Sequence, residues 1–230
     1  CRIGSKYRSR PAHRNHRPLI APFHRRSIDA ASRQGKACYH APLRQIAGML
    51  AHPILARATA FGLGVAGLAA LRAQFDALTG IALGLDRIWA MAGYFTILTN
   101  ALLVVHLLAI TKGWQIGARR AGALMVAIAT VGILYHALLA NQFPTEGLGW
   151  WADLGLHTVM PAGFAAWWLA FAPKAVRWSD VPHWLVWPVL YAAYALIRGS
   201  MTGFWPYGFL DADTLGWPHL ARNLGALLLA

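Results

Sequence analysis

The chain has 230 residues, of which 57% are hydrophobic and only 13% are charged. A soluble domain carries roughly twice that charged fraction, so the composition argues against a soluble domain and predicts a polytopic membrane protein. The net charge of +13 does not by itself indicate nucleic-acid binding, because eleven of the 21 Lys and Arg residues lie before residue 49.

Residues 1–48 form a basic arm with Asp29 as its single acid and without the apolar run of a secretory signal peptide. We expect this arm to be disordered, because its charges repel one another. A solvated tail is the plainest interpretation, with contact to anionic phospholipid headgroups or nucleic acid as the alternative. Cys1 and Cys38 lie in the arm without CxxC spacing, so neither a disulfide framework nor a zinc site is predicted.

Residues 49–230 are predicted to form an all-α transmembrane domain of six helices. A span needs about 20 mostly apolar residues to cross roughly 30 Å of hydrocarbon. Five such stretches lie at about 52–73, 89–111, 119–141, 150–172 and 183–203. A sixth apolar stretch begins near Gly216 and is too short to cross, so we expect the sequence to stop inside that helix.

Basic residues in the loops predict the orientation of these spans. Cytoplasmic loops carry an excess of Lys and Arg. The loops that contain Lys112, Arg119 and Arg120, and then Lys174 and Arg177, fall on the same side as the basic arm. The loops on the opposite side are charge-balanced or acidic. The protein is therefore predicted to lie in the inner membrane with its N-terminus in the cytoplasm.

Several polar residues inside the predicted spans fall at a similar depth. At 1.5 Å per residue, they form one layer in the outer leaflet. Ionisable groups within spans are costly and usually face the bundle interior, so this layer is a candidate functional site. Its members are Thr96, Asn100, His136, Asp153, His157 and Arg198.

The layer contains a nucleophile and a base. The hydroxyl of Thr96 becomes reactive only when a neighbour takes its proton, and the imidazole of His157 can do so. Asp153 precedes His157 by one helical turn and could orient its ring, while Asn100 or Arg198 could stabilise an oxyanion. A distance of roughly 4 Å between Thr96 Oγ1 and His157, or one bridging water, would strengthen the hypothesis, and a distance beyond about 8 Å with both side chains facing lipid would contradict it.

Two other threonines have a simpler interpretation. A threonine in a transmembrane helix commonly bonds a backbone carbonyl one turn earlier, and we expect this of Thr99 and Thr130. The last outer loop contains Trp205 and Tyr207, aromatic residues of the kind that lie at the headgroup level, followed by Asp211. This loop is either an interfacial anchor or a lid over the polar layer.

Three motifs, "YFTILTN", "LHTVMP" and "WPVLYAAYALIRGSMTGFWPYGFLD", together resemble the bacterial six-helix membrane proteins called the Pr-six-Pr family. The resemblance covers about residues 50–230. More distantly, the motifs are similar to those of the androgen-induced membrane threonine hydrolases of animals. That resemblance implies a six-helix hydrolase of fatty acid esters of hydroxy fatty acids, with Thr96 and His157 as its intramembrane Thr and His. The chain departs from the bacterial pattern at Trp167, where an acid is usual.

The sequence therefore leaves three classes of function open. The first is a hydrolase of lipid esters that needs no cofactor or metal ion, whose partners are membrane lipids and a lipid-ester substrate; no nucleic acid is expected. The second is a haem-binding electron carrier, with His136 and His157 as paired axial ligands. The third is a transporter or scaffold, although no two-fold internal repeat is visible.

Overall fold

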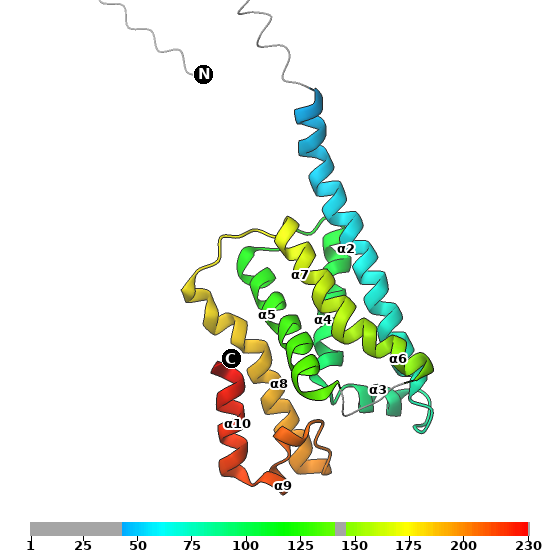
Figure 1. Ribbon diagram of the computed structural model, residues 1–230, viewed down its shortest axis with the longest axis vertical. Helices are drawn as coiled ribbons and strands as arrows, with labels where there is room; N and C mark the ends of the chain where they lie inside the picture. Colours follow the sequence, from blue (N-terminus) through cyan, green and yellow to red (C-terminus); the bar gives the residue numbers. More distant parts are fainter. Residues whose placement is uncertain (1–42, 141–145, 230) are drawn as a thin grey trace, which may run out of the picture. The chain divides into compact units, whose positions relative to one another are not determined.

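The computed structural model describes residues 43–140 and 146–229, and all regular structure in these ranges is helical (Figure 1). Residues 1–42 of the predicted disordered arm, with Cys1 and Cys38, lie outside these ranges, whereas its last residues, 43–48, lie in the first helix. The chain divides into two units, Cys1–Ala47 and Gly48–Ala230. The helices are α2 (Leu43–Ala77), α3 (Leu85–Met91), α4 (Phe95–Thr111), α5 (Ala118–Leu134), α6 (Gly147–Leu154), α7 (Met160–Phe171), α8 (Val181–Thr202), α9 (Ala212–Leu215) and α10 (Trp217–Leu229).

Four short segments of other helix types interrupt or connect these α-helices. Two are π-helical turns, η1 (Tyr135–Leu139) after α5 and η2 (Gly155–Val159) between α6 and α7. Two are 3-10 turns, η3 (Trp178–Asp180) before α8 and η4 (Gly208–Leu210) before α9.

The helical class expected from the sequence is confirmed for the described residues. Some of the helices are long and apolar enough to cross a membrane. Among the described residues, three helical stretches can cross a bilayer: His52–Ala77, Ala118–Leu139 and Gly147–Phe171. The bent pair α3 and α4 makes a fourth if it counts as one span. Helix α8, with 22 residues, and α10, with 13, are not among these candidate spans.

The second predicted span, 89–111, is wrong as a single straight helix. Helices α3 and α4 meet at 102°, and Figure 1 shows α3 lying across the end of α4. Tyr94 has extended backbone between them. A side chain at Gly93 would begin 2.5 Å from the ring of Phe204, so only glycine permits this close approach. Thr96 therefore lies in the first turn of α4 and not in the middle of a span.

Helix α5 lies at the centre of the core, where it packs against α4, α7 and α8 (Figure 1). The largest fully buried side chains include Leu103, Ile128 and Phe164. Large apolar side chains such as Ile133 and Leu169 remain exposed. An apolar exterior around a packed interior suits contact with lipid chains, which are as apolar as leucine.

Small residues allow α2 to pack closely on α4 and α7. A methyl group at Gly67 would begin 2.5 Å from Val104 Cγ2 and 2.8 Å from Met160 Cε. A methyl group at Gly163 of α7 would similarly begin 2.4 Å from Leu63 Cδ2. Small residues at helix contacts are typical of membrane bundles, because they let the backbones approach one another.

Replacement of Gly67 by Ala tests this contact. We expect Gly67→Ala to lower the free energy of unfolding by about 1–3 kcal/mol, because Val104 has a stiff branched side chain that must shift. Gly62→Ala is the matched control on the same helix, since nothing lies within 4 Å of its added methyl group. It should change stability by less than about 1 kcal/mol. Denaturant unfolding in detergent micelles measures both, and equal effects would contradict the proposed close contact.

The carboxylate of Asp180 connects the start of α5 to the start of α8. Asp180 is buried, and its Oδ1 accepts a hydrogen bond from Arg119 Nε at 2.7 Å. Its other oxygen accepts the backbone N–H of Arg177 at 3.0 Å. The hydrogen bond from Arg119 holds the pKa of Asp180 below its usual value. The ionised carboxylate therefore stabilises the folded chain.

This lowered pKa predicts a pH dependence. The contribution of Asp180 is present above the ordinary aspartate pKa of about 4 and is lost as the pH falls through the lower value of the folded state. Asp180→Asn should therefore be less stable than the unmodified chain at pH 7, and the difference should shrink below about pH 4. Thermal unfolding measured from pH 7 to pH 3 checks this. Asp86→Asn, at an exposed site, is the control, and its stability should not differ from that of the unmodified chain in this pH-dependent way.

Candidate functional site

A π-helical turn places His157 in the structure. Pro161 has no backbone N–H, so it cannot donate to the carbonyl of His157, which an α-helix would require. The chain instead widens into η2, where the N–H of Met160 donates to the carbonyl of Gly155. A similar turn, η1, follows α5, with the N–H of Ala140 bonded to the carbonyl of Tyr135. Such turns occur frequently at functional sites.

Tyr135, Asp153 and His157 form what we call the Tyr-Asp-His cluster. One oxygen of Asp153 lies 3.0 Å from His157 Nδ1, and the other accepts a hydrogen bond from the hydroxyl of Tyr135. The ring of Tyr135 stacks on that of His157, with centroids 3.9 Å apart and planes within 15°. The carboxylate keeps the proton on Nδ1, so Nε2 is the free basic nitrogen. An imidazole held in this way can act as a general base.

His136 joins the cluster from the side of η1. Its Nε2 lies 3.1 Å from the hydroxyl oxygen of Thr158, and its ring meets Tyr135 edge-on at 5.1 Å. A haem held between His136 and His157 would have to replace these contacts with Thr158, Asp153 and Tyr135. Within the described residues, no group of three or more His, Cys, Asp or Glu side chains could hold a metal ion.

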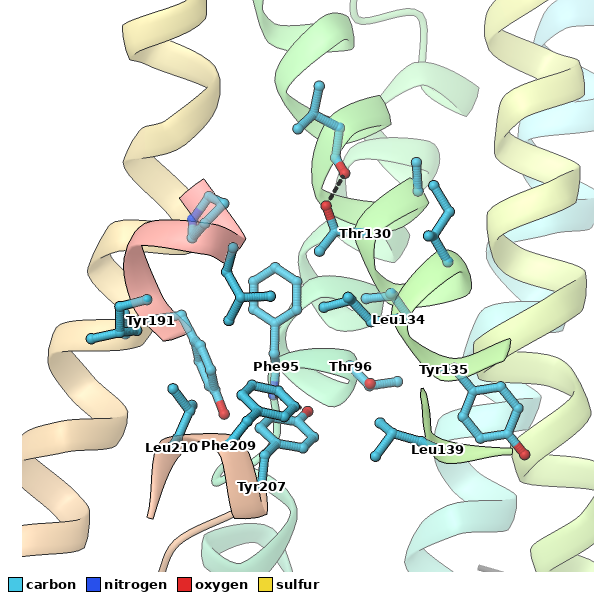
Figure 2. Close-up of a pocket in the computed structure, with 18 of the residues that line it drawn as sticks. Phe95, Thr96, Thr130, Leu134, Tyr135, Leu139, Tyr191, Tyr207, Phe209 and Leu210 are labelled. Carbon is cyan, nitrogen blue, oxygen red and sulfur yellow. Dashed lines mark hydrogen bonds between the residues drawn. The ribbon is translucent and has the colours of Figure 1, made fainter. Parts of the chain in front are cut away.

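A pocket of about 330 Å³ lies beside this cluster (Figure 2). Its walls come from α4, α5, η1, α8, α10 and the segment 207–210, and they are mainly apolar. Pockets of this size are typical of small-molecule sites. Thr130 also lines it, but its hydroxyl donates to the carbonyl of Val126 at 2.9 Å, the backbone bond expected from the sequence. The polar groups that remain are Thr96 and three tyrosines, Tyr135, Tyr191 and Tyr207.

Thr96 lines the pocket, and Figure 2 shows it between Tyr207 and Tyr135. The hydroxyl of Tyr207 accepts the backbone N–H of Phe95 at 3.1 Å and interacts with the hydroxyl of Thr96. Burial raises the pKa of Tyr207, so its hydroxyl stays protonated and can donate a hydrogen bond. The sequence predicted either an interfacial anchor or a lid for the loop that contains Tyr207, and in the structure Tyr207 lines the pocket.

Thr96 and His157 lie in neighbouring parts of the bundle without a hydrogen bond between them. The amide nitrogen of Asn100 donates to the carbonyl oxygens of Thr96, at 2.9 Å, and of Leu156, at 3.2 Å. Because both oxygens lie about 3 Å from the same nitrogen, Asn100 Nδ2, they are at most about 6 Å apart. Tyr135 contacts both regions, since it lines the pocket and stacks on His157.

Three other predicted residues lie in different surroundings. Arg198 packs between the rings of Trp89 and Phe204 and donates to the hydroxyl of Tyr194. Trp205 packs on Gly199 and donates to Asp213. Asp211 caps the start of α9, where it accepts the backbone N–H groups of Asp213 and Thr214. None of the three lines the pocket.

The sequence interpretation missed Tyr135 and misjudged Thr99. Tyr135 directly precedes His136, and its position at the end of an apolar stretch was the available signal. The hydroxyl of Thr99 is fully buried and accepts a hydrogen bond from Trp187 Nε1 at 2.9 Å, in place of the backbone bond we expected. Thr99 therefore joins α4 to α8.

Removal of the hydroxyl of Tyr207 tests whether its hydrogen bond stabilises the fold. Tyr207→Phe leaves the buried N–H of Phe95 without its acceptor. We therefore expect the free energy of unfolding to fall by about 1–3 kcal/mol. Tyr94→Phe is the matched control, because Tyr94 is exposed; it should change stability by less than about 0.5 kcal/mol. The measurement is thermal or denaturant unfolding in micelles. A Tyr207→Phe protein as stable as the control would show that this hydrogen bond has no structural role.

Comparison with known proteins found no family model, no curated protein and no solved structure that matches this chain. The chemistry of the site therefore rests on its own geometry. That geometry consists of an imidazole oriented by Asp153, next to an apolar pocket with the hydroxyls of Thr96 and Tyr207 in its wall.

Proposed function

We propose that this protein is an integral membrane hydrolase of lipid esters, with Thr96 as nucleophile and His157 as general base. The observation that carries the proposal is the Tyr-Asp-His cluster beside the apolar pocket. Asp153 orients the imidazole of His157, and Tyr135 belongs both to the cluster and to the pocket wall. The motif resemblance to membrane threonine hydrolases selects the same threonine and histidine.

The pocket suits one acyl chain of a lipid ester. Its lining is mainly apolar, and Thr96 and Tyr207 are polar groups at one edge. An acyl chain in the pocket would place its ester carbonyl at these hydroxyls. Binding the apolar chain would orient the carbonyl carbon towards Thr96 Oγ1, which is how positioning contributes to catalysis.

The reaction would follow the two steps of acyl transfer. Thr96 Oγ1 attacks the carbonyl carbon while its proton passes to His157 Nε2, and the alcohol then leaves with that proton. Water next attacks the acyl-threonine and loses a proton to His157, which passes that proton to Thr96 Oγ1 as the bond to the acyl group breaks, so the fatty acid and the free threonine are released. Because Thr96 and His157 make no hydrogen bond to each other, the proton must pass through one water molecule or after a shift of the Tyr135 ring.

Tyr207 is the best-placed donor for the oxyanion. The sequence suggested Asn100 or Arg198 for this role. Both N–H groups of the Asn100 amide face carbonyl oxygens, and Arg198 lies outside the pocket lining. The hydroxyl of Tyr207 is protonated, interacts with Thr96 and lines the pocket. A donor held in position before the reaction is the main way in which enzymes stabilise an oxyanion.

The proposal includes the membrane arrangement expected from the sequence. The proposed spans are the three stretches of sufficient length and apolarity, the bent pair of α3 and α4, and α8, with α10 as the sixth helix of the bundle. The basic residues of the loops place the N-terminus in the cytoplasm and the polar site towards the outer leaflet of the inner membrane. A lipid ester would then enter the pocket from that leaflet.

The experiment is a comparison of variants of the full chain in detergent micelles. We expect Thr96→Ala to lose labelling by a serine- and threonine-directed fluorophosphonate probe, and to cleave a fatty acid ester of a hydroxy fatty acid at least about 100-fold more slowly. His157→Gln should show the same pattern. Thr130→Ala is the matched control, because Thr130 lines the same pocket but bonds its own backbone. Unchanged labelling of Thr96→Ala would remove Thr96 from the mechanism.

A further inference from the structure

Arg198 is a buried cation that no anion of the described chain neutralises. Its relative exposure is 6%, and none of the ion pairs among the described residues includes it. Its guanidinium lies 4.1 Å from the ring centroid of Trp89 and 4.7 Å from that of Phe204. These cation–π contacts stabilise the charge but use none of its N–H groups.

Most of the hydrogen-bond donors of Arg198 are also unused. A guanidinium has five N–H donors. Within the described residues, only Nη1 has an acceptor, the hydroxyl of Tyr194 at 3.1 Å. Nε is buried without any partner. A buried charged group without partners costs free energy, which a ligand with a negative charge and several acceptor oxygens would recover.

The surroundings of Arg198 indicate that such a ligand carries an apolar chain. Arg198 lies in the C-terminal part of α8, one turn before its end, and Trp89 belongs to α3, whose side chains Leu85, Ile88 and Trp89 are all exposed. An oxyanion at the guanidinium would thus have an apolar surface beside it. Because Nε is fully covered, a ring must move for the ligand to reach it. Trp89 is the more exposed of the two rings and can do so.

We propose that Arg198 binds the oxyanion of a membrane lipid, at a site separate from the pocket at Thr96. The shared chemistry is a pair of negatively charged oxygens, which the planar fork of a guanidinium binds through two parallel hydrogen bonds. A phospholipid phosphate and a fatty acid carboxylate both supply it. The acyl chains of the lipid lie along the exposed face of α3. This site does not depend on the proposed hydrolysis.

The test is lipid binding to the purified full chain in uncharged detergent, followed as the rise in melting temperature during titration. The probes are phosphatidylglycerol, oleate, inorganic phosphate, and diacylglycerol, which has the tails without the oxyanion. We expect phosphatidylglycerol or oleate to stabilise the chain, and inorganic phosphate and diacylglycerol to have little effect. A response to phosphatidylglycerol alone identifies a phosphate site, and a response to oleate alone a carboxylate site.

Substitutions then locate the binding. Arg198→Met should weaken the apparent affinity for the active lipid at least about tenfold, the effect of losing one charged hydrogen bond. Arg198→Lys keeps the charge without the fork and should also bind more weakly. Arg72→Met is the matched control, because Arg72 is exposed and paired with Asp76; it should bind as the unmodified chain does. Thr96→Ala should also bind normally, which separates this proposal from hydrolysis.

Three outcomes would overturn the proposal. Stabilisation by diacylglycerol equal to that by the anionic lipids would make the oxyanion irrelevant. Stabilisation by inorganic phosphate equal to that by the anionic lipids at the same concentration would exclude a lipid site. Undiminished binding by Arg198→Met would exclude the residue. If Arg198→Met cannot be purified, the affinity of Arg198→Lys decides. Full affinity of Arg198→Lys for the active lipid would equally contradict the proposal.

Discussion

The missing N–H of Pro161 is the constraint on which the candidate site depends. Inside a bilayer no water can satisfy a free backbone group, so the helix must rearrange where proline removes a donor. It does so by widening into the π-helical turn Gly155–Val159. This turn carries His157 against Tyr135 and within reach of Asp153. Gly132 allows the approach, because a methyl group there would lie 3.0 Å from Pro161 and 3.4 Å from the carbonyl oxygen of His157.

Much of the helical framework could be predicted from the sequence, because apolar length is a local property. The stretches expected at 119–141 and 150–172 correspond to Ala118–Leu139 and Gly147–Phe171. The break at Gly93 could not be predicted in this way. The chain there lies against the ring of Phe204, a residue far along the chain, and a hydropathy window contains no information about such a contact.

The candidate site was harder to predict than the framework, because depth along a straight helix says little about direction. The sequence placed six polar residues in one layer. In the structure, Asp153 and His157 meet, His136 joins them through Tyr135, and Asn100 ties the backbone of Thr96 to that of Leu156. Arg198 faces Trp89 and Phe204 instead. Local periodicity can place a residue at a depth, but packing decides which neighbours it contacts.

The bend between α3 and α4 has an electrostatic consequence for Thr96. A helix that begins in the interior of a bundle brings its first amide groups with it, and these have no acceptors within the helix. One of them, the N–H of Phe95, uses the hydroxyl of Tyr207. The positive end of the α4 dipole therefore lies at the edge of the pocket. The lining of the pocket is mainly apolar, so the field of this helix end is screened less there than at a helix end surrounded by water and salt.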